Sequence, residues 1–466
     1  MSAEIIHART PAETFLASAF DHCKARLPGT SSVAQWREDS FKVFQASGLP
    51  HRRVEAWHYT DLRALMREVW PLAPAPGAAA LAALREEFTA ANTPAPRLVL
   101  ADGFFVPELS AALPEGLKVR SLASVLTEGR PDLIALLSSQ AFGQELGAPD
   151  SVIALNAALM QDGVVIEVAP GTVITEPIHL IHATSSSLPA AHFSRSALII
   201  GAGASIRLAE SCHATNQAGT ARDSQANACL IVTLGDGAAL AHTASVTGAA
   251  TGSVRLETML ARIGAGAKLD SFALVSGLGL VRRQIFVRFE GRGAAVSLSG
   301  VSLLGGRKHA DTTLRIEHAA QGCVSRETFK TILDEEATGV FQGRIRVAPG
   351  AQKTDGKMLS RAVLLSDRAA MNNKPELEIF ADDVVCGHGA TCGGLDADQL
   401  FYLQTRGLPL PEAEALLLEA FAGELIDGIG HAGLSQGFRS QVRAWLAARR
   451  KGLAAPAQEG AAAQHL

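Results

Sequence analysis

Three side chains that could bind a soft metal ion or cluster lie close together near the C-terminal end of the chain. Cys386, His388 and Cys392 belong to the segment DDVVCGHGATCGG, residues 382–394, whose glycines let the backbone bend around a bound group. In an extended segment the side chains of residues i and i+2 face the same way, so Cys386 and His388 would point at one site. Thiolate and imidazole suit zinc, Cu(I) or an iron–sulfur cluster.

The ligand count of this segment is incomplete for a closed metal site. A structural zinc site takes four ligands, whereas residues 382–394 offer three at most, and no CxxC pair elsewhere completes the set. The ligands would therefore belong to a site shared with another chain. The alternative is ordinary structure, with Cys386 as a small buried hydrophobe and His388 as a satisfied hydrogen-bonding group.

A second group of candidate ligands precedes this segment. His309, His318 and Cys323 lie in one predicted coil, around ADTTLRIEHAAQGCVS. They are either polar residues of the surface or a second ligand cluster, and their spacing alone does not decide between the two.

Two common enzyme motifs, one for phosphate binding and one for zinc-dependent hydrolysis, are missing from the chain. The sequence has no GxxxxGK[ST] P-loop and no HExxH. The GxG runs of the glycine-rich middle region lack the full GxGxxG and do not open helices, which argues against a dinucleotide-binding fold. The chain is therefore predicted not to be an enzyme and not to hydrolyse ATP itself.

The candidate ligands follow a long region in which short β-like runs alternate with glycine turns. From residue 152 to about 370, runs such as VVIEV, LIVTL and FVRF each lead into a glycine turn. The turn glycines recur at similar but not identical intervals, and they are Gly171, Gly203, Gly237, Gly266 and Gly293. An irregular period of roughly 30 residues is typical of a solenoid with one coil per repeat.

The predicted fold is mainly β: a right-handed parallel β-helix core flanked by N-terminal and C-terminal α-helical regions. Alternation places Val, Ile, Leu and Ala inward, and stacked coils bury what one coil cannot bury alone. A β-sandwich also has short strands and glycine turns and is the alternative fold. A carbohydrate-active β-helix is disfavoured, because every tryptophan and tyrosine lies outside the repeat region.

The flanking regions carry apolar residues at three- and four-residue spacing, which predicts helices. The predicted organisation is an N-terminal helical region (1–95), a linking α/β segment (96–151), the β-helix core (152–393), a C-terminal helical region (394–450) and a disordered tail (451–466).

Composition and charge exclude several classes of protein. The chain has 42 Lys and Arg against 46 Asp and Glu, a net charge of −4, so no electrostatic case exists for nucleic acid or an anionic membrane. No apolar run reaches the length of a membrane span, and the first residues do not resemble a signal peptide. Six cysteines in 466 residues do not form a disulfide framework. We therefore expect a cytoplasmic protein.

Five segments carry a resemblance to a known family. NKPELEIFADDVVCGHGATCGGLDADQLFYLQTRGL (373–408) and ETFKTILDEEATGVFQGRIRVAPGAQKTDGKMLSRAVLLSD (327–367) resemble the SufB/SufD family of iron–sulfur cluster assembly scaffolds. RRVEAWHYTDL (52–62), LVLADGFFVPELSAALPEG (98–116) and ALNAALMQDGVVIEV (154–168) are similar to its SufD members more than to its SufB members. Together the segments span most of the chain.

The resemblance implies a scaffold subunit of a SufBCD complex. It implies a heterodimer with a SufB paralogue, an attached SufC ATPase docked on helices 396–450, and a nascent iron–sulfur cluster held transiently between the paralogues. His388 would be the cluster or iron ligand, with Cys386 a nearby thiol and a second candidate ligand. A homodimer in isolation is a further expectation. The alternative is a purely structural subunit with no ligand role, and a third is a stand-alone zinc protein.

Two residues of the signature depart from the family pattern. Gly387 stands where Ser is common, and Cys392 stands where an aliphatic residue is expected. Cys392 is interpreted as a small buried substitute rather than as an extra thiol.

Overall fold

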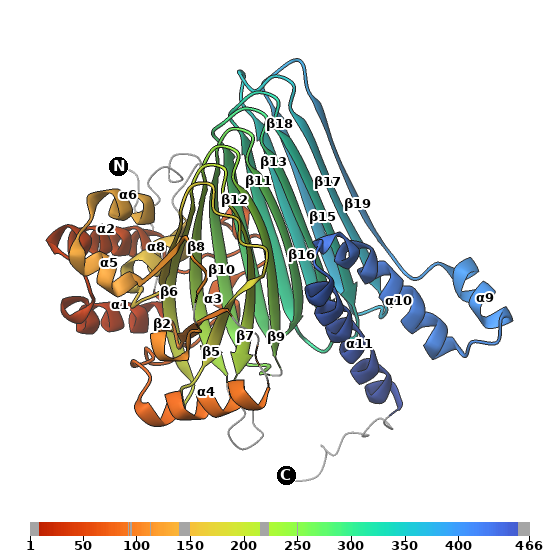
Figure 1. Ribbon diagram of the computed structural model, residues 1–466. Coiled ribbons are helices and arrows are strands. Elements are labelled where there is room, and N and C mark those ends of the chain that lie inside the picture. Colours follow the sequence, from red (N-terminus) through yellow and green to blue (C-terminus); the bar gives the residue numbers. More distant parts are fainter. Residues whose placement is uncertain are drawn as a thin grey trace, which may run out of the picture.

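The core of the protein is a parallel β-helix made of two long sheets (Figure 1). The computed structural model describes residues 9–454 apart from 92, 94–95, 112, 139–149, 215–222 and 249. One sheet has ten strands, in the order β19 (Val385–Gly393), β17 (Asp355–Leu364), β15 (Val324–Leu333), β13 (Ala295–Leu304), β11 (Lys268–Gly277), β9 (Ala239–Gly248), β7 (Ser205–Ala214), β5 (Ile178–Thr184), β1 (Arg97–Ala101) and β2 (Phe104–Phe105).

The second sheet has nine strands. Their order is β18 (Ala370–Ile379), β16 (Thr338–Val347), β14 (His309–His318), β12 (Leu280–Phe289), β10 (Val254–Ile263), β8 (Ser224–Leu234), β6 (Ala190–Ile200), β4 (Val164–Val168) and β3 (Leu117–Ser121). Even- and odd-numbered strands alternate between the sheets from β4 onward, so each coil gives one strand to each sheet.

The strand register confirms the solenoid. Leu280 of β12 lies beside His309 of β14, which lies beside Thr338 of β16, so two equal steps along the sequence lead from coil to coil. All these neighbours run parallel, whereas the hairpins of a β-sandwich would be antiparallel. The predicted β-helix is therefore confirmed, and the β-sandwich alternative is wrong.

Glycines turn the chain at the corners of the coils. Gly203, Gly237, Gly266 and Gly293 all have φ between +62° and +67°, a conformation that residues with a side chain rarely adopt. The corners also stack tightly: a Cβ added at Gly291 would lie 2.0 Å from the backbone nitrogen of Ala265, one coil away. The repeated glycine turns of the sequence are thus the corners of the solenoid.

Rows of apolar side chains fill the interior of the β-helix. One row runs through consecutive coils of the nine-stranded sheet, since its members are neighbours in register and all belong to the buried core. The row is Leu198, Val232, Ala261, Val287, Ile316 and Ile345. Because each coil packs on the previous one, every added coil buries further apolar side chains of its neighbour.

The first coils are closed by segments from both sides of the predicted core boundary. Strands β1 and β3, inside the predicted linking segment, pair with β5 and β4 and extend the two sheets. Helix α8 (Ser151–Leu159), inside the predicted core range, instead packs on the outer face of the nine-stranded sheet, and all its residues except Ala154 are buried. The domain boundaries themselves remain predictions.

Helices from the N-terminal region cover the first part of the β-helix (Figure 1). They are α1 (Pro11–Cys23), α2 (Ser31–Ser47), α3 (Leu62–Leu65), α4 (Ala78–Ala90), α5 (Leu122–Glu128) and α6 (Pro131–Ser138). The start of α1 is fixed by a capping box, in which Thr10 and Glu13 each accept from the other's backbone N–H. Arg37 of α2 is buried and donates to the carbonyls of Ala158 and Met160, which ties α2 to α8.

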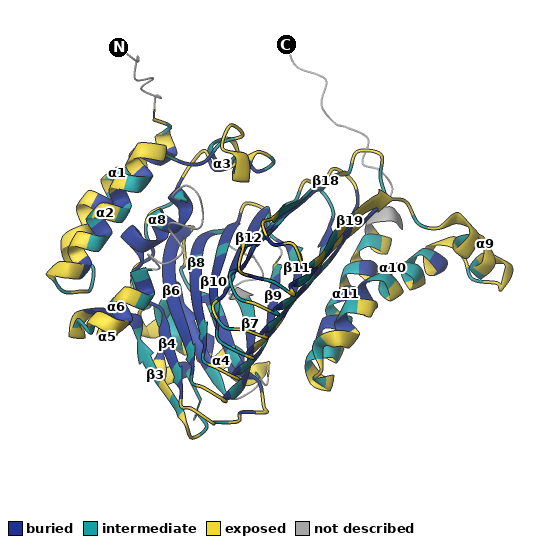
Figure 2. Cartoon of the chain, turned by 90° about the horizontal axis from the view of Figure 1, so that it is seen from above, coloured by how far each residue is buried: buried dark blue, intermediate teal, exposed yellow. Residues whose placement is uncertain are grey.

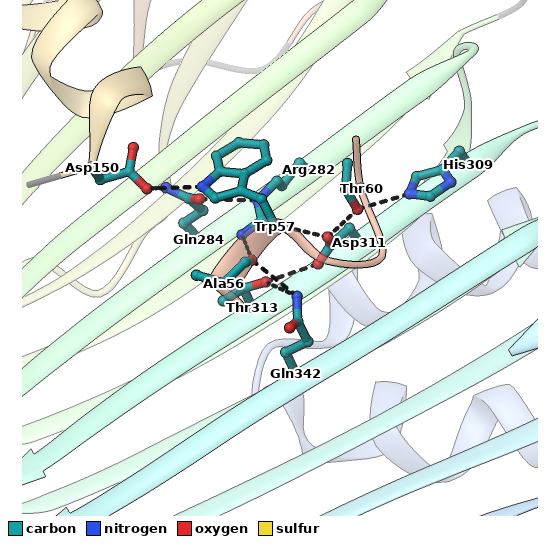
Figure 3. A network of polar contacts seen from close by, with 10 residues as sticks. All are labelled: Ala56, Trp57, Thr60, Asp150, Arg282, Gln284, His309, Asp311, Thr313 and Gln342. Atoms are coloured by element: carbon teal, nitrogen blue, oxygen red, sulfur yellow. Dashed lines mark hydrogen bonds and ion pairs between the residues drawn. The ribbon is translucent and has the colours of Figure 1, made fainter. Parts of the chain in front are cut away.

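A tryptophan from the N-terminal region is anchored on the outer face of the nine-stranded sheet (Figure 3). Trp57 ends a short 3-10 helix, η2 (Glu55–Trp57), and its indole lies over the guanidinium of Arg282, 3.7 Å from the ring centroid. Arg282 forms a buried ion pair with Asp311 and donates to the Ala56 carbonyl over 2.7 Å. Thr60 donates to Asp311 as well. This network fastens the N-terminal region to coils that lie far from it in the sequence.

Three helices follow the last strand. They are α9 (Ala397–Thr405), α10 (Leu410–Ile426) and α11 (Ala432–Ala454). Helices α10 and α11 pack on the outer face of the ten-stranded sheet, whereas α9 has no buried residue and projects from the body of the protein (Figure 2). No helix among the described residues combines the length and the apolar character needed to cross a membrane. Of the predicted disordered tail, residues 455–466 lie outside the described residues.

Candidate functional site

The last coil of the β-helix is formed by two edge strands. β19 is the terminal strand of the ten-stranded sheet and β18 the terminal strand of the other sheet. Large apolar side chains are exposed around this coil: Leu359, Ile379, Phe380 and Val385, with Val385 61% exposed. Edge strands with exposed apolar side chains present backbone N–H and C=O groups to any chain that pairs with them.

The two predicted ligands lie on this edge strand, in the row of positions that continues the interior of the β-helix. Cys386 is the register neighbour of Gly356 and His388 that of Met358, and both neighbours are buried. Cys386 is half-buried and packs against the interior core, whereas His388 is exposed. The expectation that the two share one side of an extended segment agrees with this register, and their role as ligands remains a prediction.

The thiol of Cys386 is held in its protonated form. Partial burial raises the pKa of Cys386 above 9.0, and the charges of Asp355 and Glu327 raise it further. The backbone N–H of Gly356, which bonds to the sulfur, has the opposite effect and lowers the pKa. A thiol must lose its proton to become a metal ligand, so binding a cation at Cys386 would release a proton.

Cys392 lies farther along the same strand. It is the register neighbour of Ala362 and its side chain is exposed. The interpretation of Cys392 as a small buried substitute is therefore wrong, because β19 is an edge strand with no coil stacked on it among the described residues. Within that same part of the chain, no group of three His, Cys, Asp or Glu side chains is arranged to hold a metal ion.

The second predicted group, His309, His318 and Cys323, is separated by the sheet itself. His309 lies on the outer face and shares a hydrogen bond of 2.9 Å with Thr60. His318 and Cys323 are fully buried in the interior, where the ring of His318 stacks near Phe289. The joint ligand cluster is wrong, because His309 lies on the opposite face of the sheet from His318. The surface alternative is wrong for His318 and Cys323, which are buried, whereas His309 is partly exposed.

An acidic side chain lies in the interior, two strands from His388. Glu327 of β15 is the register neighbour of Met358, which in turn neighbours His388. Its carboxylate is fully buried and makes no hydrogen bond with the described residues. Burial raises its pKa to about 8, although Ser325 and Arg326 oppose the shift. Sequence reasoning missed Glu327. The only signal in the sequence was that Glu327 occupies an inward-facing position of a predicted strand.

A second interior feature that sequence reasoning missed is a polar chamber in the first half of the β-helix. Glu210 is bracketed by His182 and His242, whose Nε2 atoms lie 2.8 and 3.0 Å from its carboxylate oxygens. Burial raises the pKa of Glu210, but the bonds and charges of the two histidines outweigh burial and leave it below its usual value. Nδ1 of His242 continues the chain to Ser271 over 2.8 Å.

The opposite wall of the chamber carries a second charged group. Glu257 accepts from Arg255 over 2.6 Å and from Arg283 over 2.8 Å. Cys212 lies in the field of these groups, and burial raises its pKa to about 12. The space between the two walls is about 40 Å³, room for water rather than for an organic ligand. Each carboxylate here is paired twice, so the chamber is a satisfied polar core.

The C-terminal helices join the body through a buried lysine. Nζ of Lys330 on β15 donates to the carbonyl of Phe421 over 2.8 Å and pairs with Glu424. Beyond this anchor, Phe401 and Tyr402 of α9 are 68% and 56% exposed. An exposed aromatic pair on a projecting helix is typical of a protein contact surface.

Two short glycine patterns lie at the start of α11. Residues 428–433 fit GxGxxG and residues 433–437 fit GxSxG. They follow helix α10 rather than a strand, and the hydroxyl of Ser435 donates to the carbonyl of Ile426. Neither pattern has the strand-to-helix context that its chemistry requires.

Family comparisons cover almost the whole described chain. The family described as SufBD protein N-terminal region matches residues 13–180. The family described as SUF system FeS cluster assembly, SufBD core domain, matches residues 181–421. The two matches meet within the β-helix and include the last coil.

Individual relatives agree with these matches. An iron–sulfur cluster assembly SufBD family protein of Synechocystis is 31% identical over 431 residues, 90% of this chain and 93% of the relative. The iron–sulfur cluster assembly protein SufD of Escherichia coli is 29% identical over 401 residues, 84% and 88% of the two chains. A chloroplastic protein of Arabidopsis thaliana is 40% identical over 123 residues, 26% of each chain. The β-helix with its terminal Cys386 and His388 therefore belongs to a member of the SufB/SufD family of iron–sulfur cluster assembly proteins.

Proposed function

We propose that this chain is a scaffold subunit that pairs with a SufB-like paralogue and builds nascent iron–sulfur clusters at the shared interface. The observation that carries the proposal is the last coil: two edge strands, exposed apolar side chains and two candidate ligands lie together there. The chain itself is not an enzyme in this proposal. The six free cysteines agree with a reducing compartment, which we take to be the cytoplasm.

The paralogue would dock on β18 and β19. A second β-helix ending in similar strands could satisfy their outward backbone groups and cover Phe380 and Val385 at once. Exposed apolar side chains beside the edge would then be buried, which is the main favourable term in protein association. A second copy of this chain would use the same surface in isolation.

The cluster is cargo in this proposal, not a resident cofactor. His388 is exposed and presents an imidazole to the interface, and Cys386 lies two residues away in the same row. Two ligands are too few to hold iron, so the paralogue must supply the remainder. Weak, incomplete ligation by each chain suits a cluster that has to be passed on.

The ATPase would dock on the C-terminal helices. The sequence has no P-loop, so ATP hydrolysis belongs to a separate SufC-like chain. Helix α9 projects with Phe401 and Tyr402 exposed, and α10 is fixed to the ten-stranded sheet through Lys330. Movement of an ATPase bound at α9 would therefore be transmitted to β15, in the sheet that ends in β19.

Anaerobic co-purification with the paralogue and the ATPase tests the proposal. Val385→Asp should abolish recovery of the paralogue while the ATPase is retained, and Phe401→Asp should do the reverse. Leu188→Asp is the matched control, because Leu188 is 74% exposed on a loop remote from both surfaces. Normal recovery of both partners by both interface variants would refute the assigned surfaces. Recovery of the wild-type chain with neither partner would refute the proposal itself.

A further inference from the structure

A cleft lies between the N-terminal segment and the outer face of the nine-stranded sheet. Its volume is about 560 Å³, within the range of small-molecule sites. One wall is the segment from Pro50 to Trp57, and the floor is formed by β12, β14, β16 and β18. The cleft shares β18 with the last coil, through Lys374 and Glu376, but it opens on the outer face of the sheet, whereas the proposed function uses the free edge of β18.

The floor of the cleft carries two arginines side by side. Phe286, Arg315, Arg344 and Glu376 are register neighbours on four successive strands of the sheet. Adjacent strands lie about 4.8 Å apart, so the guanidinium groups of Arg315 and Arg344 start from neighbouring backbone positions. Like charges placed directly opposite one another on a sheet are destabilising.

The two arginines differ in their partners. Arg344 contacts Glu376 over 3.1 Å and Glu378 over 3.3 Å. Arg315 forms no ion pair or hydrogen bond with any of the residues that the structure describes. Partial burial lowers the pKa of Arg315 and the charges of Arg344 and Arg346 add to the shift, whereas the carboxylates of Glu378 and Glu317 oppose it. Neither carboxylate is within ion-pair distance of Arg315, so its hydrogen-bond donors are open to water or to a ligand.

The other charges of the cleft are already neutralised. Lys374 pairs with Glu55 over 2.8 Å, and Arg282 pairs with buried Asp311. Asp150 is occupied as the N-cap of α8, where it accepts from two backbone N–H groups. Among the four cationic side chains of the lining, Arg315 is the one that forms no ion pair or hydrogen bond with the described residues.

The segment that forms one wall of the cleft is bonded to the floor. The carbonyl of Ala56 accepts from Arg282 over 2.7 Å and from Gln342 over 3.2 Å, and the Trp57 indole covers Arg282 (Figure 3). These bonds tie the segment that overhangs the cleft to β12 and β16. A ligand would enter a site that is already formed, so little binding energy is lost to ordering the wall.

We propose that this cleft binds a small organic anion whose carboxylate or phosphate group is held by Arg315 with help from Arg344. A guanidinium fork matches either oxyanion in a two-point hydrogen bond, and the anion would also relieve the repulsion between the two arginines. The body of the ligand would lie along the polar row of Gln284, Thr313 and Gln342, which lines the same floor.

Calorimetric titration of the full chain with two probes tests the proposal and separates the two oxyanions. Citrate represents carboxylates and ATP without Mg²⁺ represents phosphates. At least one should bind, with an affinity that falls with added NaCl. Arg315→Gln should weaken that binding by about tenfold or more, and Arg315→Lys by less, because the charge remains while the fork is lost.

The control is Arg307→Gln, which removes the same charge from a side chain that is 89% exposed at a distant corner. Binding that Arg307→Gln weakens as strongly as Arg315→Gln would show a general charge effect and overturn the proposal. Absence of heat for both probes, together with loss of a protein partner from the Arg315→Gln variant, would also overturn it and make the cleft a protein-docking surface.

Discussion

The indole of Trp57 covers the guanidinium of Arg282 at 3.7 Å, although η2 and β12 lie far apart in the sequence. Both side chains are almost fully buried. The contact combines apolar burial with attraction between the cation and the ring face, a pairing that strengthens when water is excluded. This contact is thus one of the anchors that hold the N-terminal region to the β-helix.

Trp57→Ala should lower the free energy of unfolding by about 3–5 kcal/mol, because it leaves a cavity and uncovers a buried ion pair. Denaturation in guanidinium chloride, followed by fluorescence and by circular dichroism, measures the loss. His58→Ala is the control, since the adjacent imidazole is exposed. Equal stability of the two variants would show that the anchor contributes nothing.

Glu327 makes stability depend on pH in an unusual direction. Burial raises its pKa from 4.5 to about 8, so the folded state keeps a proton that the unfolded state releases above pH 4.5. The free energy of unfolding therefore falls as pH rises from about 4.5 to about 8, by an amount on the order of 4 kcal/mol. Glu327→Gln should remove this loss and be more stable than wild type at pH 8.5.

The comparison needs unfolding curves of both proteins at pH 5 and at pH 8.5. Glu86→Gln, on the exposed face of α4, provides the matched amide substitution. If Glu327→Gln differs from wild type by the same amount at both pH values, the carboxyl does not titrate between them and its assignment is wrong.

Lys330 should control how firmly the C-terminal helices are attached. Lys330→Met removes a buried ammonium that serves the Phe421 carbonyl and Glu424, at a cost of about 1–3 kcal/mol. Faster amide hydrogen exchange throughout α10, with β-helix strands unchanged, is the expected signature. Lys357→Met is the comparison, because that lysine is exposed on β17. If amide exchange in α10 is the same in Lys330→Met as in Lys357→Met, apolar packing alone holds α10 on the sheet.

His388→Ala should leave the complex with its partners assembled but lower its iron and acid-labile sulfide about tenfold or more. Cys386→Ala should have a smaller effect, since its thiol is half-buried and protonated. Chemical iron and sulfide assays on anaerobically purified complex give the answer, with His58→Ala as control. Unchanged cluster content in His388→Ala would instead favour a purely structural subunit.

Thiol labelling checks the exposure of the last strand without any partner. Iodoacetamide at pH 8 should modify Cys392 first and Cys386 slowly, because burial holds both thiols protonated and covers Cys386 more. Cys229 and Cys323 are buried and should react only after unfolding. Mass mapping of the labelled sites would contradict this order if Cys386 reacted ahead of Cys392.

The sequence was sufficient for the solenoid and for the position of the candidate ligands. Glycines that recur at an irregular period form corners with positive φ, as at Gly237 and Gly266, because only the local backbone angle has to be satisfied there. Cys386 and His388 share a row because strand alternation is also local. Local rules of this kind can be read one segment at a time.

Features that depend on the pairing of distant strands could not be predicted from single segments of the sequence. Glu210 meets His182 and His242 only because three coils stack in one register, and each of these residues alone resembles a break in an apolar pattern. Cys392 was misjudged for a similar reason: its burial depends on whether another coil covers β19. The missing information is the register and the number of coils.

Each coil of the β-helix serves as the template for the next, and β18 and β19 form a template on which no strand of the described residues pairs. Backbone hydrogen bonds carry no sequence information, so any polypeptide that can run along either edge would extend the stack. Selection among such polypeptides must come from bordering side chains such as Phe380, Val385 and His388. A partner that covered this end would therefore also prevent unselective pairing of other polypeptides with the two free edges.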